Sequence, residues 1–494
     1  MIRLRKCYRE RLLPVLERFD RLCDSPRWRP TLEKLAQALT AAKQAALQLP
    51  RFWVALVLMA AAVLAFWRPY YFFIHDDWRT LALMVDQPLK QYVLQPEGEE
   101  WFPIFHLAFF GLVRTFGDHY GWMILVTCLG TGLSAFLLYL FLKRHLRPDL
   151  ALALSLFYAV APVHLATAPM AFYLCYGLCL AFFLAALLLT DRFSRSPSLG
   201  LLLMIGLCGT LSVFSHNYTL LALAALPLYP LFTGNPGNRR EFWALSAVFL
   251  ALGLVFALGY FKFAGVKAAS SINHGLFTRF PFWYFPLHWF AGAYAAPFTY
   301  VFYNDRLPPG LQLAIGAIFF GLITAVIFSW GNRGEKRLGL WALALNGLPF
   351  LTVSLVRCNF SLGQAFSHRY GVFTFLGALL LVGLAWTIAG RKLPHRPWAQ
   401  VLLPLGVMAG IILGQFWHTP GIQNLYKDRS HIARITYEYY GENPADDLNS
   451  PEEASRIFLI PDYPFLTEGQ IVAIRRFLQD PAGGPQLSAS RLEP

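Results

Sequence analysis

The 494-residue chain is poor in charge, because only 14% of its residues are Asp, Glu, Lys or Arg whereas 56% are hydrophobic. Its seven cysteines are scattered, and none has the spacing of a metal site or of a disulfide framework. The chain also lacks a Walker loop, a GxSxG elbow, an HExxH helix and a CxxC pair. Its chemistry therefore does not come from any of these common motifs.

What the chain does contain is long apolar sequence. Stretches of roughly 17–25 apolar residues recur through residue 417, which is the length needed to span a bilayer as a helix. The first begins near Phe52 and does not resemble a cleavable signal peptide. We therefore predict an all-α polytopic membrane protein with about 11 transmembrane helices. The expected spans are 51–68, 120–142, 149–168, 171–190, 198–215, 217–232, 241–262, 310–330, 338–356, 371–390 and 398–417.

The net charge of +14 is concentrated between these spans. Residues 1–51 hold twelve Lys or Arg against five Asp or Glu. Further basic clusters lie at 143–147, 192–195, 239–240, 333–337 and 391–396. With a cytoplasmic N-terminus every cluster falls on the cytoplasmic side, as the positive-inside rule requires. The basic balance therefore indicates topology and contact with anionic membrane lipid, not nucleic-acid binding.

Three regions follow from this topology. Residues 1–50 are expected to form cytoplasmic amphipathic helices, and residues 51–417 a transmembrane domain whose first outer loop is 69–119. Residues 418–494 hold seven Lys or Arg against eleven Asp or Glu, with strand character at 456–461 and a helical pattern at 469–478. We expect this tail to be a small α/β extracytoplasmic domain.

Two segments do not fit simple spans. Residues 102–116 are apolar but short, and a crossing there would move the 143–147 cluster to the outside. We therefore expect a helix in or near the outer interface. Residues 263–309 are expected to form a long outer loop with an aromatic interfacial segment, although a re-entrant helix pair would preserve the same topology.

An acidic pair, Asp76 and Asp77, follows the first span directly. Two adjacent like charges raise the pKa of one carboxyl, which suits a general base working near neutral pH. The alternative is a polar helix cap at the membrane boundary, since Asp is a good N-cap residue. We favour the catalytic interpretation, with Asp76 the preferred base.

Basic residues are expected mainly on the cytoplasmic side, so an arginine in an outer loop is unusual. The loop after the ninth span ends in Ser367-His368-Arg369-Tyr370. The guanidinium of Arg369 could bind a phosphate bidentately, or it could lie at the membrane interface beside a tyrosine. His368, Arg357 and Arg79 are further candidates for binding a donor phosphate.

Three other outer residues are candidates for acceptor binding or an auxiliary role, namely His164, Glu100 and His106. A capping histidine explains His164 equally well, and a solvated loop explains Glu100. No group of residues has convincing metal spacing, so no cofactor is expected.

Four features carry a resemblance: the Asp pair, Glu100-Trp101-Phe102-Pro103, the run from Leu156 to His164, and Arg369-Tyr370. Together they resemble the GT-C superfamily of polytopic glycosyltransferases over residues 51–417, in the protein O-mannosyltransferase-like branch. The resemblance implies inverting transfer of a sugar from a polyprenyl-phosphate carrier to a hydroxyl of a glycan, lipid or protein. It also implies that Asp76 or Asp77 is the base and that Arg369 binds the donor.

The implied location is the bacterial inner membrane, with the C-terminus outside the cytoplasm and a role in building the cell envelope. Two alternatives remain open at this point. The first is a ligase that moves a whole lipid-linked glycan. The second is a transporter or flippase of envelope precursors, although transporters usually carry charges near the middle of the membrane and internally repeated halves.

Overall fold

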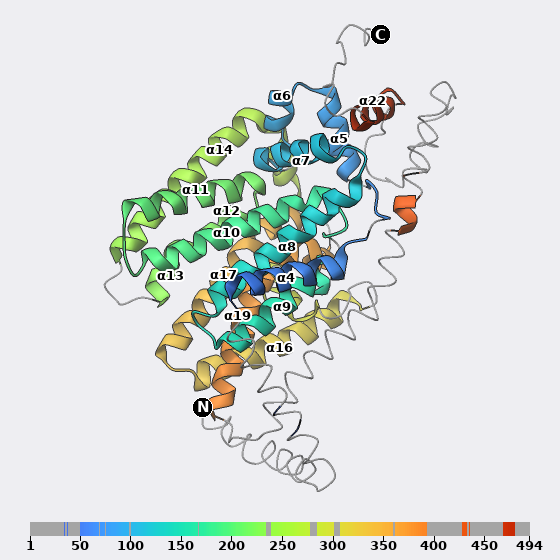
Figure 1. Ribbon diagram of the computed structural model, residues 1–494. Coiled ribbons are helices and arrows are strands. Elements are labelled where there is room, and N and C mark those ends of the chain that lie inside the picture. Colours follow the sequence, from blue (N-terminus) through green and yellow to red (C-terminus); the bar gives the residue numbers. More distant parts are fainter. Residues whose placement is uncertain are drawn as a thin grey trace.

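The computed structural model describes most of the apolar part of the chain and short pieces of its tail. These residues are 50–68, 70–74, 76–97, 100–165, 167–233, 239–276, 284–300, 307–358, 361–392, 427–431 and 468–479, together with Lys34, Gln37 and Arg434. They are helical throughout apart from loops and an isolated bridge between Glu97 and Glu100 (Figure 1). The fold of the described part is therefore all-α.

Six helices are long and apolar enough to cross a membrane, which identifies an integral multi-pass membrane protein. They are α8 (Tyr120–Leu142), α10 (Leu174–Phe193), α14 (Arg239–Leu276), α16 (Pro309–Trp330), α17 (Arg333–Arg357) and α19 (His368–Lys392). Shorter apolar helices complete the bundle: α4 (Arg51–Phe66), α7 (Pro103–Phe116), α9 (Pro148–Val160), α11 (Leu199–Ser215), α12 (Thr219–Leu223) and α13 (Ala225–Thr233).

Ten of the eleven expected spans coincide with a helix or with a consecutive helix pair in this bundle. The eleventh, 398–417, lies outside the described residues, as do nearly all of residues 1–49. The agreement has a simple cause, because a helix satisfies all of its own backbone hydrogen bonds and is the natural form of an apolar stretch of this length.

The stretch expected as an outer loop, 263–309, is more helical than predicted. Helix α14 continues to Leu276, and α15 (Tyr284–Phe290) leads through a π-helical turn, η4 (Ala291–Ala295), into η5 (Ala296–Phe298). These turns pack against α16, α17 and α19. The absence of a side chain at Gly292 makes the packing possible, because Phe350 of α17 occupies the space of a Cβ atom there.

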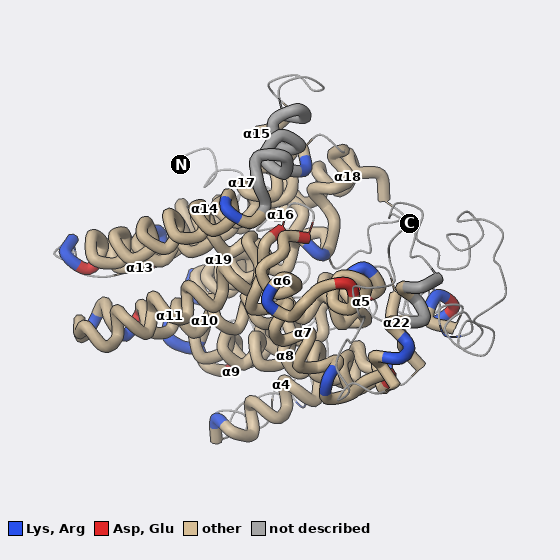
Figure 2. The backbone as a smooth tube through the Cα atoms, turned by 90° about the horizontal axis from the view of Figure 1, so that it is seen from above, with Lys and Arg blue, Asp and Glu red and all other residues tan. Residues whose placement is uncertain are grey.

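The basic clusters gather at one end of the bundle, called the basic end below. Successive membrane helices alternate in direction, so α4, α14 and α17 begin at this end whereas α8, α10 and α19 finish there. Figure 2 shows Lys and Arg at the tips of α4 and of the α13–α14 hairpin. Arg391 of α19 also pairs with Glu335 of α17 at 2.5 Å. The charge pattern that predicted the topology is thus matched by one shared end.

The opposite end, called the site end below, carries the first outer loop. Between α4 and α8 the chain forms α5 (Asp76–Asp86), α6 (Leu89–Leu94) and α7. Helix α7 starts with Pro103 in its first turn and stops at Gly117, whose φ of 55° favours glycine. The connections of α7 to α6 and to α8 both lie at the site end, so α7 does not cross to the basic end.

The described parts of the C-terminal region are helical. The helix expected at 469–478 is present as α22 (Glu468–Gln479), which lies beside α5 (Figure 1). The expected strand at 456–461 lies outside the described residues, and no α/β domain is seen in the described part of this region.

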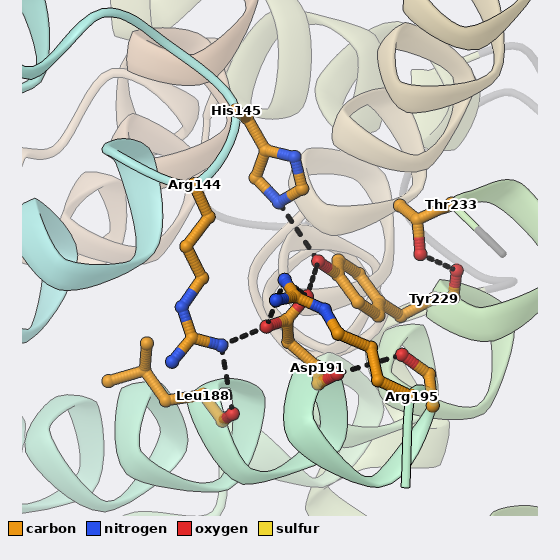
Figure 3. A network of polar contacts seen from close by, with 8 residues as sticks. Arg144, His145, Leu188, Asp191, Arg195, Tyr229 and Thr233 are labelled. Atoms are coloured by element: carbon orange, nitrogen blue, oxygen red, sulfur yellow. Dashed lines mark hydrogen bonds and ion pairs between the residues drawn. The ribbon is translucent and has the colours of Figure 1, made fainter.

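A buried carboxylate fastens three helices together at the basic end (Figure 3). Asp191 of α10 pairs with Arg144 at the end of α8 and with Arg195 at 2.8 Å, and it accepts a 2.7 Å hydrogen bond from the Tyr229 hydroxyl of α13. The ring of His145 lies 2.9 Å from the same hydroxyl. Burial lowers the pKa of His145 to about 4, so its imidazole is neutral.

We expect Asp191→Ala to destabilise the bundle by about 3 kcal/mol, because it leaves the Arg144 guanidinium without its counter-charge in a partly buried place. Thermal unfolding in detergent measures the effect. Asp149→Ala is the matched control, because Asp149 pairs with Arg147, whose side chain is 60% exposed, and should cost less than about 1 kcal/mol. Equal losses in the two variants would contradict a fastening role for Asp191.

Candidate functional site

Asp77 is fully buried and its two carboxylate oxygens are in use. Oδ1 accepts the backbone N–H of Phe172 at 2.7 Å, and Oδ2 accepts the backbone N–H of Ile74 at 3.1 Å and the Tyr120 hydroxyl at 2.5 Å. Burial raises the pKa of Asp77 to about 7, although these three donors oppose the rise. Asp77 thereby joins the start of α5 to α8 and to the turn before α10.

The side chain of Asp76 points in a different direction from that of Asp77. It is the first residue of α5, it is half-buried, and its backbone carbonyl accepts the Thr80 hydroxyl at 2.9 Å. Neighbouring residues on a helix point about 100° apart, so the two carboxylates cannot face the same side. The charge of Asp76 raises the pKa values of both Asp77 and Glu100. Asp76 is therefore the more exposed member of the pair.

A second carboxylate, Glu97, organises the loop between α6 and α7. Its side chain is only 3% exposed and lies 3.4 Å from Nε of Arg79 and 3.5 Å from Nε2 of His106. The Thr80 hydroxyl donates to it at 3.2 Å. The fully buried His106 ring stacks on Tyr92 with 4.7 Å between centroids. Two of the expected site residues thus contact a carboxylate that sequence reasoning did not single out.

Glu100 lies where acidic and basic side chains meet. Burial raises its pKa to about 7, while the positive charges of Arg357 and Arg369 lower it and the carboxylates of Asp76 and Glu97 raise it. The bridge between Glu97 and Glu100 fixes the loop by two backbone hydrogen bonds of 2.9 and 3.1 Å. The charges of Asp76, Arg357 and Arg369 therefore all act on Glu100, although these residues are distant from one another in the sequence.

Aromatic side chains surround these charges. The guanidinium of Arg369 lies 4.8 Å from the centroid of the Tyr370 ring, and it interacts electrostatically with Tyr173, Tyr176 and Tyr218. The Tyr218 ring also packs edge-on against Tyr370 at 5.5 Å, so Arg369 lies beside a cluster of phenol rings.

His216 is a site residue that the sequence gave no reason to select. Its buried ring lies 4.5 Å from the rings of both Tyr176 and Tyr218, and its Nε2 is 3.9 Å from Glu100. Burial lowers the pKa of His216 to about 3, so the ring is neutral, and its Nε2 is too far from Glu100 for a direct hydrogen bond. A lone histidine after an apolar span carries no spacing signal that could have identified it.

Two other expected residues lie apart from these charges. The buried ring of His368 packs edge-on against Tyr300 at 5.3 Å. His164 packs edge-on against Tyr158 at 4.8 Å and lines a small polar cavity within the bundle, together with hydroxyl groups of α8. For both residues the observed surroundings are those of packed core histidines.

Among the described residues, no group of three or more His, Cys, Asp or Glu side chains is arranged to hold a metal ion. The acidic residues of the site are instead interleaved with arginines and histidines. Acidic and basic charges therefore offset one another in part within the protein itself.

The fold and this site define a multi-pass helical membrane protein with a charged site at one end. No family model and no curated protein sequence matches the chain. Among solved structures, the chain is similar to the Archaeoglobus fulgidus oligosaccharyltransferase tethered with an acceptor peptide containing the NVT sequon via a disulfide bond. The TM-score is 0.45 at 12% sequence identity, with 86% of this chain and 63% of that chain covered. The present chain thus spans less than two thirds of that protein.

The different surroundings of the two aspartates predict different effects on stability. Asp77→Ala leaves three hydrogen-bond donors without an acceptor and should cost about 3 kcal/mol. Asp76→Ala removes one half-buried carboxylate at a helix start and should cost less than about 1 kcal/mol. Thermal unfolding of both variants in the same detergent is the measurement, and a greater loss for Asp76→Ala would contradict the assignment of Asp77 as the structural member.

Proposed function

We propose that this chain is a GT-C-type glycosyltransferase, of the protein O-mannosyltransferase-like branch, that moves a sugar from a polyprenyl-phosphate carrier to an acceptor hydroxyl. The observation that supports the proposal most is that the charges of Asp76, Arg357 and Arg369 all act on Glu100 in a protein built of apolar helices. A carboxylate base beside a phosphate-binding surface at the edge of a membrane is what this reaction requires.

The proposed reaction is a single displacement. A carboxylate oxygen of Asp76 takes the proton of the acceptor hydroxyl as the acceptor oxygen forms a bond to the anomeric carbon. The bond between that carbon and the phosphate oxygen breaks, and its electron pair leaves with the polyprenyl phosphate. The configuration at the anomeric carbon is inverted. Arg369 and Arg357 stabilise the charge that develops on the leaving phosphate.

The other acidic residues support this step without taking part in it. Asp77 holds the first turn of α5 against the bundle, and Glu97 holds Arg79 and His106 in the adjoining loop. Such fixed surroundings keep Asp76 in one position relative to the arginines. Positioning of this kind supplies a large part of the rate in transfer reactions.

The first test compares wild type with Asp76→Asn, purified in lipid and supplied with a panel of radiolabelled polyprenyl-phosphate sugars. Removal of a general base should lower turnover by about 10²–10⁴-fold, while donor binding changes little. Transfer or release of labelled sugar is the measurement. Asp118→Asn, at an exposed carboxylate of the same end, should keep full activity.

Two outcomes would overturn parts of this proposal. If the wild-type protein binds no polyprenyl-phosphate donor, the glycosyltransferase assignment fails, and transport of envelope precursors becomes the better account. If Asp76→Asn retains full turnover with a donor that the wild type uses, the enzyme assignment stands but the base lies elsewhere. Transfer of a whole glycan in place of a single sugar would identify a ligase.

The pKa of Glu100 predicts a pH dependence of donor binding. A phosphodiester keeps one negative charge at neutral pH and competes with ionised Glu100 for Arg357 and Arg369. Below pH 7 Glu100 is protonated and adds no negative charge beside the donor, whereas above pH 7 its charge opposes the donor. The donor KM should therefore rise by up to about tenfold between pH 6 and pH 8.

Glu100→Gln is the control for this effect, because its side chain stays neutral at both pH values. The donor KM of this variant should be low and nearly constant between pH 6 and pH 8. An unchanged pH dependence in Glu100→Gln would show that another group controls donor binding.

A further inference from the structure

The C-terminal helix α22 lies against the helix that carries Asp76. Its residues Ile474, Phe477 and Leu478 are 0%, 4% and 1% exposed, at the spacing that forms one apolar face of a helix. This face packs on the first outer loop, since α22 lies along α5 and the Phe477 ring is 6.4 Å from that of Phe110 in α7.

Polar contacts fix the register of this packing. The side-chain amide of Gln470 donates to Asp86, the last residue of α5, at 2.6 Å. The guanidinium of Arg114 in α7 lies 5.3 Å from the Phe110 ring and 5.6 Å from the Phe477 ring. Helix α22 therefore contacts α5 and also α7, the helix that follows the loop with Glu97 and Glu100.

The burial of α5 on more than one side shows that it needs a packing partner such as α22. Seven of its eleven residues are buried, in the runs 77–78, 80–82 and 84–85, which together cover more than one face of the helix. One side is held by the Asp77 contacts to Tyr120 and Phe172. A short helix of this kind is unstable alone, so its position depends on what packs around it.

A second C-terminal piece lies on the same loop. The ammonium group of Lys427 is 5.8 Å from the centroid of the Tyr70 ring, and the guanidinium of Arg434 is 5.3 Å from that of Phe72. Tyr70 and Phe72 belong to the segment that leads from α4 into α5. Both described parts of the C-terminal region thus contact the first outer loop.

We propose that α22 is a positioning element of the active site, which sets the place of Asp76 by packing on α5. The inference rests on the proposed function for its catalytic consequence, while the packing of α22 on α5 can be measured without any activity. Ile474, Phe477 and Gln470 are the positioning residues, and none of them is expected to touch a substrate.

The test combines hydrogen exchange with kinetics on the full-length protein in lipid. In the double variant Ile474→Ala/Phe477→Ala, we expect backbone amides of 76–86 to exchange at least about tenfold faster, because the cover of α5 is loosened. Turnover should fall by about tenfold while the donor KM changes less than about twofold, since Arg357 and Arg369 do not lie on α5.

Three further variants make the result specific. Phe477→Leu keeps an apolar side chain and should restore both exchange protection and turnover. Gln470→Ala removes only the contact to Asp86 and should give a smaller change in the same direction. Arg476→Ala, at an exposed position of α22, should leave exchange and turnover as in the wild type.

The exchange and turnover results test the positioning role of α22 separately from the proposed function. Unchanged exchange at 76–86 in the double variant would show that α22 does not hold α5. Faster exchange with unchanged turnover would overturn the positioning role, and so would equal effects on turnover and donor KM. A wild-type protein with no transfer activity would overturn the proposed function and its catalytic consequence, while the exchange data would still decide whether α22 holds α5.

Discussion

The site end of this protein depends on one buried carboxylate, that of Asp77. Surrounded by apolar side chains, it is tolerable only because Tyr120 and the backbone of Ile74 and Phe172 donate to it. These donors belong to α8, to the segment before α5 and to the turn before α10. Satisfying one carboxylate therefore fixes three parts of the chain, and it determines the direction in which Asp76 can point.

Nearby groups also offset the charges of the other acidic residues in the site. The buried Glu97 lies 3.4 Å from Nε of Arg79, and the partly buried Glu100 is influenced by the positive charges of Arg357 and Arg369. The offset is incomplete for Glu100, whose pKa stays raised to about 7. A site of this kind is stable without a ligand and still responds strongly to an added anion.

Much of the fold could be predicted from the sequence, because apolar length and the placement of basic residues are strong local signals. The same signals indicated that Asp76, Glu100 and Arg369 share one end. They could not separate the roles of Asp76 and Asp77, which differ only in the direction in which each points from α5. Glu97 and His216 were not identified because their contacts join segments that are distant in the sequence.

The contact between α22 and α5 also has a consequence for the order in which the protein is made. Ribosomes synthesise α5 near the beginning of the chain and α22 only after all the described membrane helices. During translation and insertion, α5 therefore lacks one of its covers, and Asp76 is not yet held in place. The bundle can assemble in the membrane first, and the site end is completed last, when α22 packs onto α5.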